Sequence, residues 1–158
     1  FPVDRRGVLF SGRERQIVAQ GLTRPHSARL WRGRVWLDNS GYGEFGAVTG
    51  GKFEVVARLP GWTRGLCFSG DVAFVATSRV IPRFRQYAPG LDVDQSVCGV
   101  HAVDPKSGTT LASVIWPRGN QIFAVEAVPS NWTRGLPFSS DQPTDEHFLR
   151  SLFSCAMF

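Results

Sequence analysis

Long apolar runs are absent from this chain of 158 residues, in which no stretch of 18 consecutive apolar side chains occurs. A helix that spans a bilayer needs about 20 such residues. The sequence therefore predicts a protein that does not span a membrane, although a peripheral place in a membrane complex stays open. The motifs of the standard nucleic-acid-binding folds are absent as well, so we expect no nucleic-acid partner.

Cysteine and histidine are scarce, with three of each. Cys67, Cys98 and Cys155 are widely spaced, and the chain has neither a Cys-x-x-Cys pair nor histidines at ligand spacing. We interpret the cysteines as buried reduced thiols and expect no bound metal and no cofactor. Reduced thiols and the lack of a signal peptide favour the cytoplasm, but the chain begins with Phe1 rather than methionine, so processing is the alternative.

Lysine is nearly absent, because 16 arginines stand against two lysines in a chain of net charge +5. Eight of the arginines fall within residues 5–34. Such a bias suits nucleic acid or an acidic partner. However, the arginines lie beside glycines or at alternate positions of short apolar runs, which is typical of the solvated face of a β-strand. We adopt that second interpretation.

A short phrase occurs three times, as GLTRP at residues 21–25, GWTRG at 61–65 and NWTRG at 131–135. The second and third copies extend to WTRGLCFSGD and WTRGLPFSSD, which are identical at eight of ten positions. Spacings of about 40 and 70 residues are typical of repeat architectures, and about 40 residues is the length of one propeller blade. The arginine of each phrase is interpreted as a structural tie between neighbouring blades.

Strand-length runs separated by turn signals fill residues 7–116, as an antiparallel meander requires. Residues 7–20 predict two strands, residues 26–59 predict a complete four-stranded blade, and residues 65–116 predict a second one. A long connection, residues 78–96, interrupts the second blade and is expected to be a contact loop without secondary structure. Residues 120–128 are expected to be the inner strand of a third blade.

The period of the pattern changes near the C-terminus. From Asp145 onward the apolar residues fall on one face of a helix. We therefore predict an all-β fold, a partial β-propeller of about three four-stranded antiparallel blades in residues 1–143, followed by a short amphipathic helical tail in residues 144–158.

The order of several phrases is similar to one known family. These are GLTRPHSAR from Gly21, VWLDNSG from Val35, LPGWTRGL from Leu59, CGVHAVD from Cys98 and QIFAVEAVP from Gln121. Over residues 4–129 the chain resembles the C-terminal half of an uncharacterised bacterial β-propeller family, domain of unknown function 4915. The resemblance implies a propeller fold and no assigned catalytic residue. The tail from Asn131 does not match the family pattern.

Polar residues at the start of the inner strands are the candidates for a binding site. In a propeller these positions face the central channel, where ligands bind. The candidates are His26, Arg64, Asn120 and Gln121. His26 has no second histidine or cysteine in register, so a hydrogen-bonded structural role is the alternative, with Asp38 and Glu126 as the nearest carboxylates. His101 is expected to pack or to face solvent.

The sequence carries no motif that indicates an enzyme. GYGEFG at residues 41–46 matches GxGxxG, but Gly50 and Gly51 follow at once, which favours a hairpin over a dinucleotide site. A Gly-x-Ser-x-Gly elbow is absent, and no catalytic residue is assigned. We thus lean toward a protein that is not an enzyme.

The leading interpretation is a non-catalytic interaction and assembly subunit of a larger complex, whose open blade edges are closed by a protein partner or by self-association. The alternative is a small-molecule-binding protein or metal-assisted enzyme with its site in the channel. The expected partner contacts are Arg83, Phe84, Arg85, Tyr87, Phe148, Leu149, Leu152 and Phe153.

Overall fold

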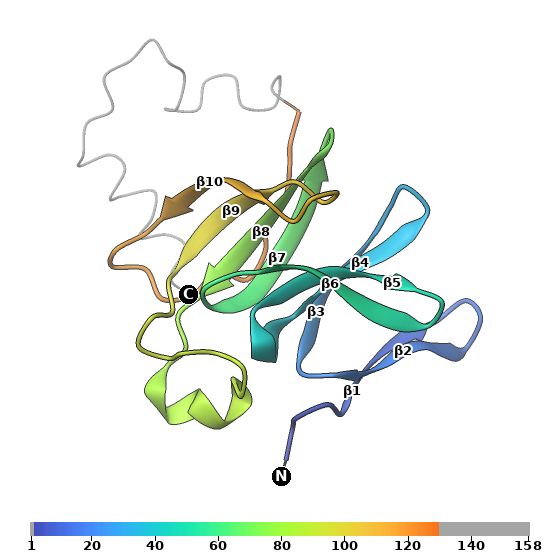
Figure 1. The fold of residues 1–158 in the computed structure, drawn as a ribbon, viewed down its shortest axis with the longest axis horizontal. Helices are drawn as coiled ribbons and strands as arrows, with labels where there is room; N and C mark the ends of the chain where they lie inside the picture. Colours follow the sequence, from blue (N-terminus) through green and yellow to red (C-terminus); the bar gives the residue numbers. More distant parts are fainter. Residues whose placement is uncertain (1, 130–158) are drawn as a thin grey trace. The chain divides into compact units, whose positions relative to one another are not determined.

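The computed structural model describes residues 2–129, in which the chain forms ten β-strands and two short 3-10 helices. The chain divides into two compact units between Ala127 and Val128, and all of these elements lie in the first unit. The predicted all-β fold class is confirmed: the strands form three antiparallel sheets, one of two strands and two of four (Figure 1). Within residues 2–129 no helix is long and apolar enough to cross a membrane. The predicted tail helix and its boundary lie outside the described residues.

The first sheet pairs β1 (Gly7–Ser11) with β2 (Gln16–Leu22). Alternate residues of β1 are exposed, as the period of two in a strand dictates. Phe10 and Ile17 are register partners, and their side chains are 56% and 54% exposed. This sheet therefore presents an apolar cross-strand pair to solvent.

The second sheet is a meander of four strands in chain order. Its strands are β3 (Pro25–Trp31), β4 (Arg34–Asn39), β5 (Glu44–Thr49) and β6 (Lys52–Arg58), with the 3-10 helix η1 (Ser40–Tyr42) between β4 and β5. The β3–β4 turn needs two consecutive left-handed residues, Arg32 at φ 48° and Gly33 at φ 73°, a geometry that matches the twist of a tight hairpin. β4 and β5 are antiparallel partners with Asn39 opposite Glu44, so residues 41–46 belong to a hairpin, as predicted, and not to a dinucleotide-binding turn.

The third sheet repeats the same topology. Its strands are β7 (Trp62–Ser69), β8 (Val72–Ser78), β9 (Gly99–Val103) and β10 (Thr110–Ile115). The β8–β9 connection contains the 3-10 helix η2 (Pro82–Tyr87), the isolated yellow-green coil in Figure 1, so the expectation of a loop without secondary structure was wrong. Pro82 at its first position has the φ that such a helix needs.

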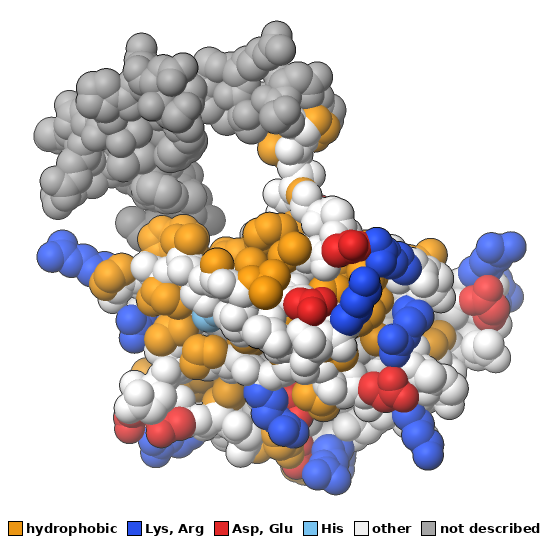
Figure 2. Space-filling model, turned by 45° about the horizontal axis from the view of Figure 1, so that its top comes forward, with side chains coloured by type: hydrophobic (Ala, Val, Ile, Leu, Met, Phe, Trp, Pro, Cys, Tyr) orange, Lys and Arg blue, Asp and Glu red, His pale blue; other side chains and the backbone are white. Residues whose placement is uncertain are grey.

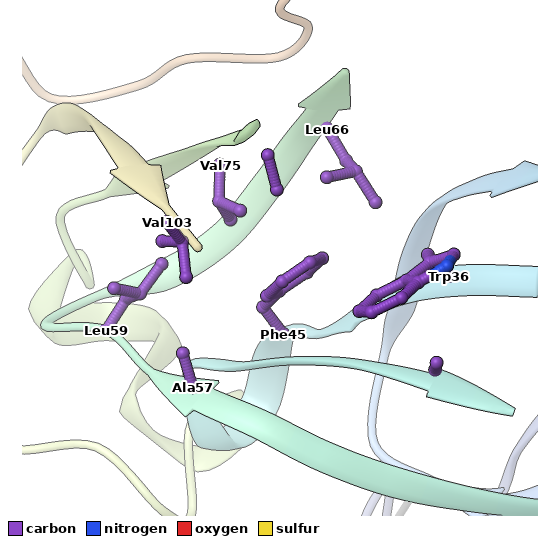
Figure 3. Packing of buried hydrophobic residues seen from close by; sticks show 9 residues of the cluster. Trp36, Phe45, Ala57, Leu59, Leu66, Val75 and Val103 are labelled. Carbon is purple, nitrogen blue, oxygen red and sulfur yellow. The ribbon is translucent and has the colours of Figure 1, made fainter. Parts of the chain in front are cut away.

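The hydrophobic core lies between the two four-stranded sheets. Trp36 and Phe45 come from the second sheet, and Leu66 and Val75 come from the third; all four are at least 97% buried. Figure 3 shows these side chains converging from both sheets. Phe68 of β7 packs against this cluster and stacks on Trp31 with ring centroids 4.5 Å apart. These contacts hold β7 against β3 and β4.

The threonine of the repeated phrase ties neighbouring elements together. Thr23 Oγ1 donates to Asp4 Oδ1 at 2.8 Å, and the Thr23 amide donates to Asn39 Oδ1 at 2.6 Å. Thr63 Oγ1 donates to the Glu44 carbonyl at 3.1 Å. Both threonines are fully buried. The tie that the repeat predicted for the arginine is thus made by the residue before it.

Residues 120–127 do not form the inner strand that the sequence predicted. A strand is defined by a ladder with a neighbour, and within residues 2–129 no segment supplies that ladder. The segment instead bonds to the end of β8: the Ile122 amide donates to Ser78 Oγ at 2.9 Å, and the Arg79 amide donates to the Asn120 carbonyl at 2.8 Å. It is therefore a segment without regular secondary structure that is bound to the end of β8 through its first residues.

Candidate functional site

Three of the four predicted channel residues line one cavity. His26 at the start of β3, Arg64 near the start of β7 and Gln121 in the anchored segment surround a space of about 40 Å³. A cavity of this size holds a few water molecules or one small polar group. Its full lining is Arg24, His26, Ser40, Trp62, Arg64, Ser78 and Gln121. The positions of His26, Arg64 and Gln121 at the starts of predicted inner strands had indicated these three residues as candidates.

The fourth predicted residue, Asn120, does not line the cavity. Its carbonyl accepts hydrogen bonds from the Arg79 amide at 2.8 Å and from Gln121 Nε2 at 3.0 Å. Gln121 Nε2 also lies 3.0 Å from the Arg79 carbonyl. Asn120 thus positions the segment that brings Gln121 to the cavity.

Two copies of the internal repeat each contribute an arginine to the cavity lining. Arg24 of the first Thr-Arg phrase directly precedes β3, and Arg64 of the second phrase lies in β7. Two serines also line the cavity, Ser40 directly after β4 and Ser78 as the last residue of β8. Sequence reasoning missed Arg24 and both serines, although the match between Arg24 and Arg64 in the repeated phrase was a signal that could have found the first.

Both arginines lie over aromatic rings. The Arg24 guanidinium is 5.0 Å from the ring centroid of Tyr87 in η2, and the Arg64 guanidinium is 4.4 Å from that of Phe123. Within residues 2–129 neither guanidinium has an ion pair or a hydrogen bond. Because a ring face occupies the plane and not the edge of a guanidinium, the N–H groups of both arginines stay available to a ligand.

His26 is half-buried between these two cations. Burial and the charges of Arg64 and Arg24 lower the pKa of the His26 side chain from its ordinary value. All three effects disfavour the imidazolium, since it would be desolvated and would face like charge. At neutral pH the ring is therefore uncharged and offers one N–H donor and one acceptor nitrogen.

Asp38 is fully buried on β4, and neither of its carboxyl oxygens has a hydrogen-bond partner of good geometry within the described residues. Burial raises the pKa of Asp38 well above its ordinary value, while the Ser27 hydroxyl and the charge of Arg29 lower it in part. Ser27 sits at the bulge of β3 with φ 58°, where its Oγ accepts from the Gly65 amide at 2.8 Å. The hydroxyl proton of Ser27 is thus free to face the carboxyl group.

Trp62 lines the cavity, and its side chain carries an unpartnered donor that is itself buried. Its indole Nε1 is buried and has no hydrogen-bond partner within residues 2–129. A buried N–H without a partner costs about 1–3 kcal/mol, so such a group marks a place where an acceptor is missing. Ser40 and Ser78, in contrast, already donate to the carbonyls of Thr63 and Ile122.

The other predicted candidates lie away from the cavity. Glu126 forms an ion pair with Arg29 at 2.5 Å. His101 is a buried structural residue of the third sheet: its Nε2 is 3.0 Å from Thr77 Oγ1 and its Nδ1 is 2.8 Å from Ser113 Oγ. Within residues 2–129 no group of three His, Cys, Asp or Glu side chains could hold a metal ion.

Four of the predicted partner contacts lie on η2. Arg83 and Arg85 are exposed, and the Arg83 guanidinium is 4.6 Å from the ring centroid of Phe84. Phe84 and Tyr87 pack with centroids 6.0 Å apart, and both are half-buried. The remaining contacts, Phe148, Leu149, Leu152 and Phe153, lie outside the described residues.

The cysteines of the described region are buried and free. Burial raises the pKa of the Cys67 and Cys98 thiols, which keeps them protonated and unreactive at neutral pH. This agrees with the prediction of reduced thiols for these two residues. Cys155 lies outside the described residues.

One comparison with known proteins finds a match. The model of a family described as "Domain of unknown function (DUF4915)" matches residues 3–134. The match reaches past Asn131, the residue from which the sequence had been taken to depart from the family pattern. No curated protein and no solved structure matches the chain.

Proposed function

The chain belongs to the family described as domain of unknown function DUF4915, and from this premise we propose that it is a non-catalytic assembly subunit built as a partial β-propeller. Two consecutive four-stranded meanders that pack on each other support the propeller interpretation. The observation that carries the assembly role is the incomplete first sheet. It has two strands where each of the others has four.

A two-stranded sheet is marginally stable by itself and leaves hydrogen-bonding edges open. In the described residues β1 pairs only with β2, so its outer edge carries no strand. The exposed pair of Phe10 and Ile17 lies on the face of the same sheet. An open groove of about 660 Å³ is lined by the end of β2 and by residues of β6. These features fit a surface that a further β-sheet covers.

The partner that we propose is a second copy of this chain. If β1 pairs with β1 of the copy across a two-fold axis, two sheets of two strands become one continuous sheet of four. That is the size of the other two sheets. Such an interface is isologous, so Phe10 of each copy gains a cross-strand neighbour on β1 of the other copy.

Light scattering behind a sizing column tests this assembly. The expected mass is twice the 17.4 kDa of the chain, and Phe10→Lys should shift the particle to the mass of a monomer. Leu30→Lys is the matched control, because Leu30 is 77% exposed but lies on β3. A monomer at high protein concentration, or equal masses for Phe10→Lys and wild type, would contradict the proposal.

The cavity supports a second candidate function, the binding of a small molecule. The observation that favours it is that two cationic side chains without a counterion in residues 2–129, Arg24 and Arg64, line one small cavity. A ligand-dependent rise in melting temperature that is lost in Arg64→Gln would test it.

A further inference from the structure

We propose that the cavity between Arg24, His26 and Arg64 binds a tetrahedral oxyanion, either inorganic phosphate or the phosphate group of a small phosphate monoester. This inference rests on small-molecule binding as the second candidate function and names the class of its ligand. It is independent of the assembly role, because no cavity residue lies on β1 or β2.

The charge of the cavity selects the sign of the ligand. Its lining contains two guanidinium groups and no carboxylate. Acidic side chains neutralise other arginines of the described region, and Figure 2 shows acidic side chains lying against basic ones on the surface: Arg29 pairs with Glu126 at 2.5 Å and Arg58 pairs with Glu44 at 2.8 Å. Arg24 and Arg64 have no such partner within residues 2–129. An anion is the ligand that satisfies both charges, whereas a metal cation would be repelled.

The hydrogen-bonding groups select an acceptor. The edges of both guanidiniums and one ring N–H of neutral His26 are donors on the lining that lack partners within residues 2–129. The donors of Gln121, Ser40 and Ser78 are already used by backbone carbonyls. A group that only accepts hydrogen bonds, from several directions, fits this set.

The arrangement of the donors favours phosphate over carboxylate. A carboxylate is planar, and one arginine fork satisfies both of its oxygens. Here the two guanidiniums come from different parts of the fold, just before β3 and within β7. The Arg24 guanidinium lies over the ring of Tyr87 in η2, and the Arg64 guanidinium lies over the ring of Phe123. Four oxygens in a tetrahedron can meet donors on separate walls at once. The volume of about 40 Å³ admits one such group and leaves no room for a large apolar ligand.

The test is calorimetric titration of the full chain with inorganic phosphate, and separately with glycerol phosphate and with acetate. We expect phosphate to bind and Arg64→Gln or Arg24→Gln to weaken binding at least tenfold. Arg83→Gln is the matched control, because Arg83 is an exposed arginine that also lies over a ring but does not line the cavity. Its affinity should equal that of wild type.

The competing anions distinguish the sources of the ligand. Tighter binding of glycerol phosphate than of inorganic phosphate would identify a phosphate monoester, and the reverse would identify the free ion. The proposal would be overturned if acetate bound more tightly than phosphate, or if Arg64→Gln and wild type bound phosphate with equal affinity. Absence of phosphate binding at about 10 mM would overturn it as well. If the protein instead binds an uncharged compound and Arg64→Gln abolishes that binding, the cavity is a small-molecule site but its ligand is not an oxyanion. That result would support the second candidate function and overturn the proposed ligand class. The mass of the particle reports separately on the assembly role.

The pKa of His26, followed by NMR, is a second readout. The charged groups that face this ring are Arg24 and Arg64, and Asp38 is its register partner on β4. Bound phosphate should raise the pKa of His26, because the anion offsets the two guanidiniums. Arg64→Gln should raise it without phosphate and reduce the further rise on adding phosphate. A His26 pKa that phosphate leaves unchanged would contradict binding at this place.

Discussion

Asp38 on β4 lies directly opposite His26 on β3, so a fully buried carboxyl group is the register partner of a half-buried imidazole that lines the cavity. Such pairs usually form an ion pair, yet here the pKa of Asp38 is raised and the pKa of His26 is lowered. Burial favours the neutral form of both groups, and the arginines add to this at His26. Both pKa shifts thus favour the neutral form of each group.

Asp38→Asn should stabilise the protein more as pH rises. Because the folded pKa of Asp38 is above its unfolded value, its contribution to stability is complete below about pH 4 and is lost as pH rises through the folded pKa. Asparagine does not titrate, so the variant should gain roughly 1–3 kcal/mol at pH 8 and little at pH 4. Urea unfolding at both pH values measures this. Asp94→Asn, an exposed site, should show no such trend.

His101→Phe should cost stability and flatten its dependence on pH. The change leaves the hydroxyls of Thr77 and Ser113 without their ring partner, at about 1–3 kcal/mol. Burial lowers the folded pKa of His101, so its contribution is complete above about pH 6.5 and is lost as pH falls through the folded pKa.

Urea unfolding between pH 7.5 and pH 5 checks the His101 prediction. His26→Gln is the comparison, since it removes a histidine whose pKa is shifted in the same direction but which lies outside the third sheet. An acid-dependent loss in His101→Phe as steep as in wild type would show that this histidine does not contribute to the pH dependence.

Arg79→Lys should loosen the β8–β9 connection. The Arg79 guanidinium donates to the carbonyls of Ser96, Pro117 and Gly119 at 3.2, 3.2 and 3.1 Å. An ammonium group cannot reproduce this planar arrangement of donors, so we expect a loss of about 1–3 kcal/mol. Limited proteolysis should cut the variant sooner than wild type within residues 79–98. Arg83→Lys, on the exposed side of η2, should leave the cleavage rate unchanged.

Gly61→Ala should be far more costly than Gly70→Ala. A Cβ at Gly61 would lie 2.8 Å from the Ser78 carbonyl oxygen and 2.9 Å from that of Val97, and its φ is +150°. We expect roughly 2–5 kcal/mol from the backbone strain and the crowding together. Gly70 has φ +57° with nothing near its Cβ position, so only about 1 kcal/mol is expected there. Thermal unfolding compares the two, and equal losses would contradict the close packing at Gly61.

The strand plan could be predicted because its signals are local. Alternation of apolar residues and glycine-rich turns act over a few residues, and these signals predicted all ten strands of the described region. The strand predicted at residues 120–128 failed for the opposite reason. Its composition suits a strand, but a strand also needs a neighbour with which to form hydrogen bonds, and within residues 2–129 none is there.

The sequence could predict which strand ends contribute to the site, but not how their side chains are partnered. The start of each inner strand indicated His26, Arg64 and Gln121, and the repeated phrase carried the information for Arg24. The pairing of each guanidinium with a ring could not be read in advance, since Tyr87 and Phe123 lie 63 and 59 residues from Arg24 and Arg64.

The sequence by itself determined the antiparallel meanders, their turns and the repeated Thr-Arg phrase, because these depend on the conformational preferences of neighbouring residues. Only the tertiary structure decided which charges stay without a partner. A carboxylate from a distant segment pairs with Arg29 and one from the neighbouring strand pairs with Arg58, while Arg24 and Arg64 meet rings instead. That difference depends on how two sheets pack around a shared core, and it turns two copies of one phrase into a single cationic cavity.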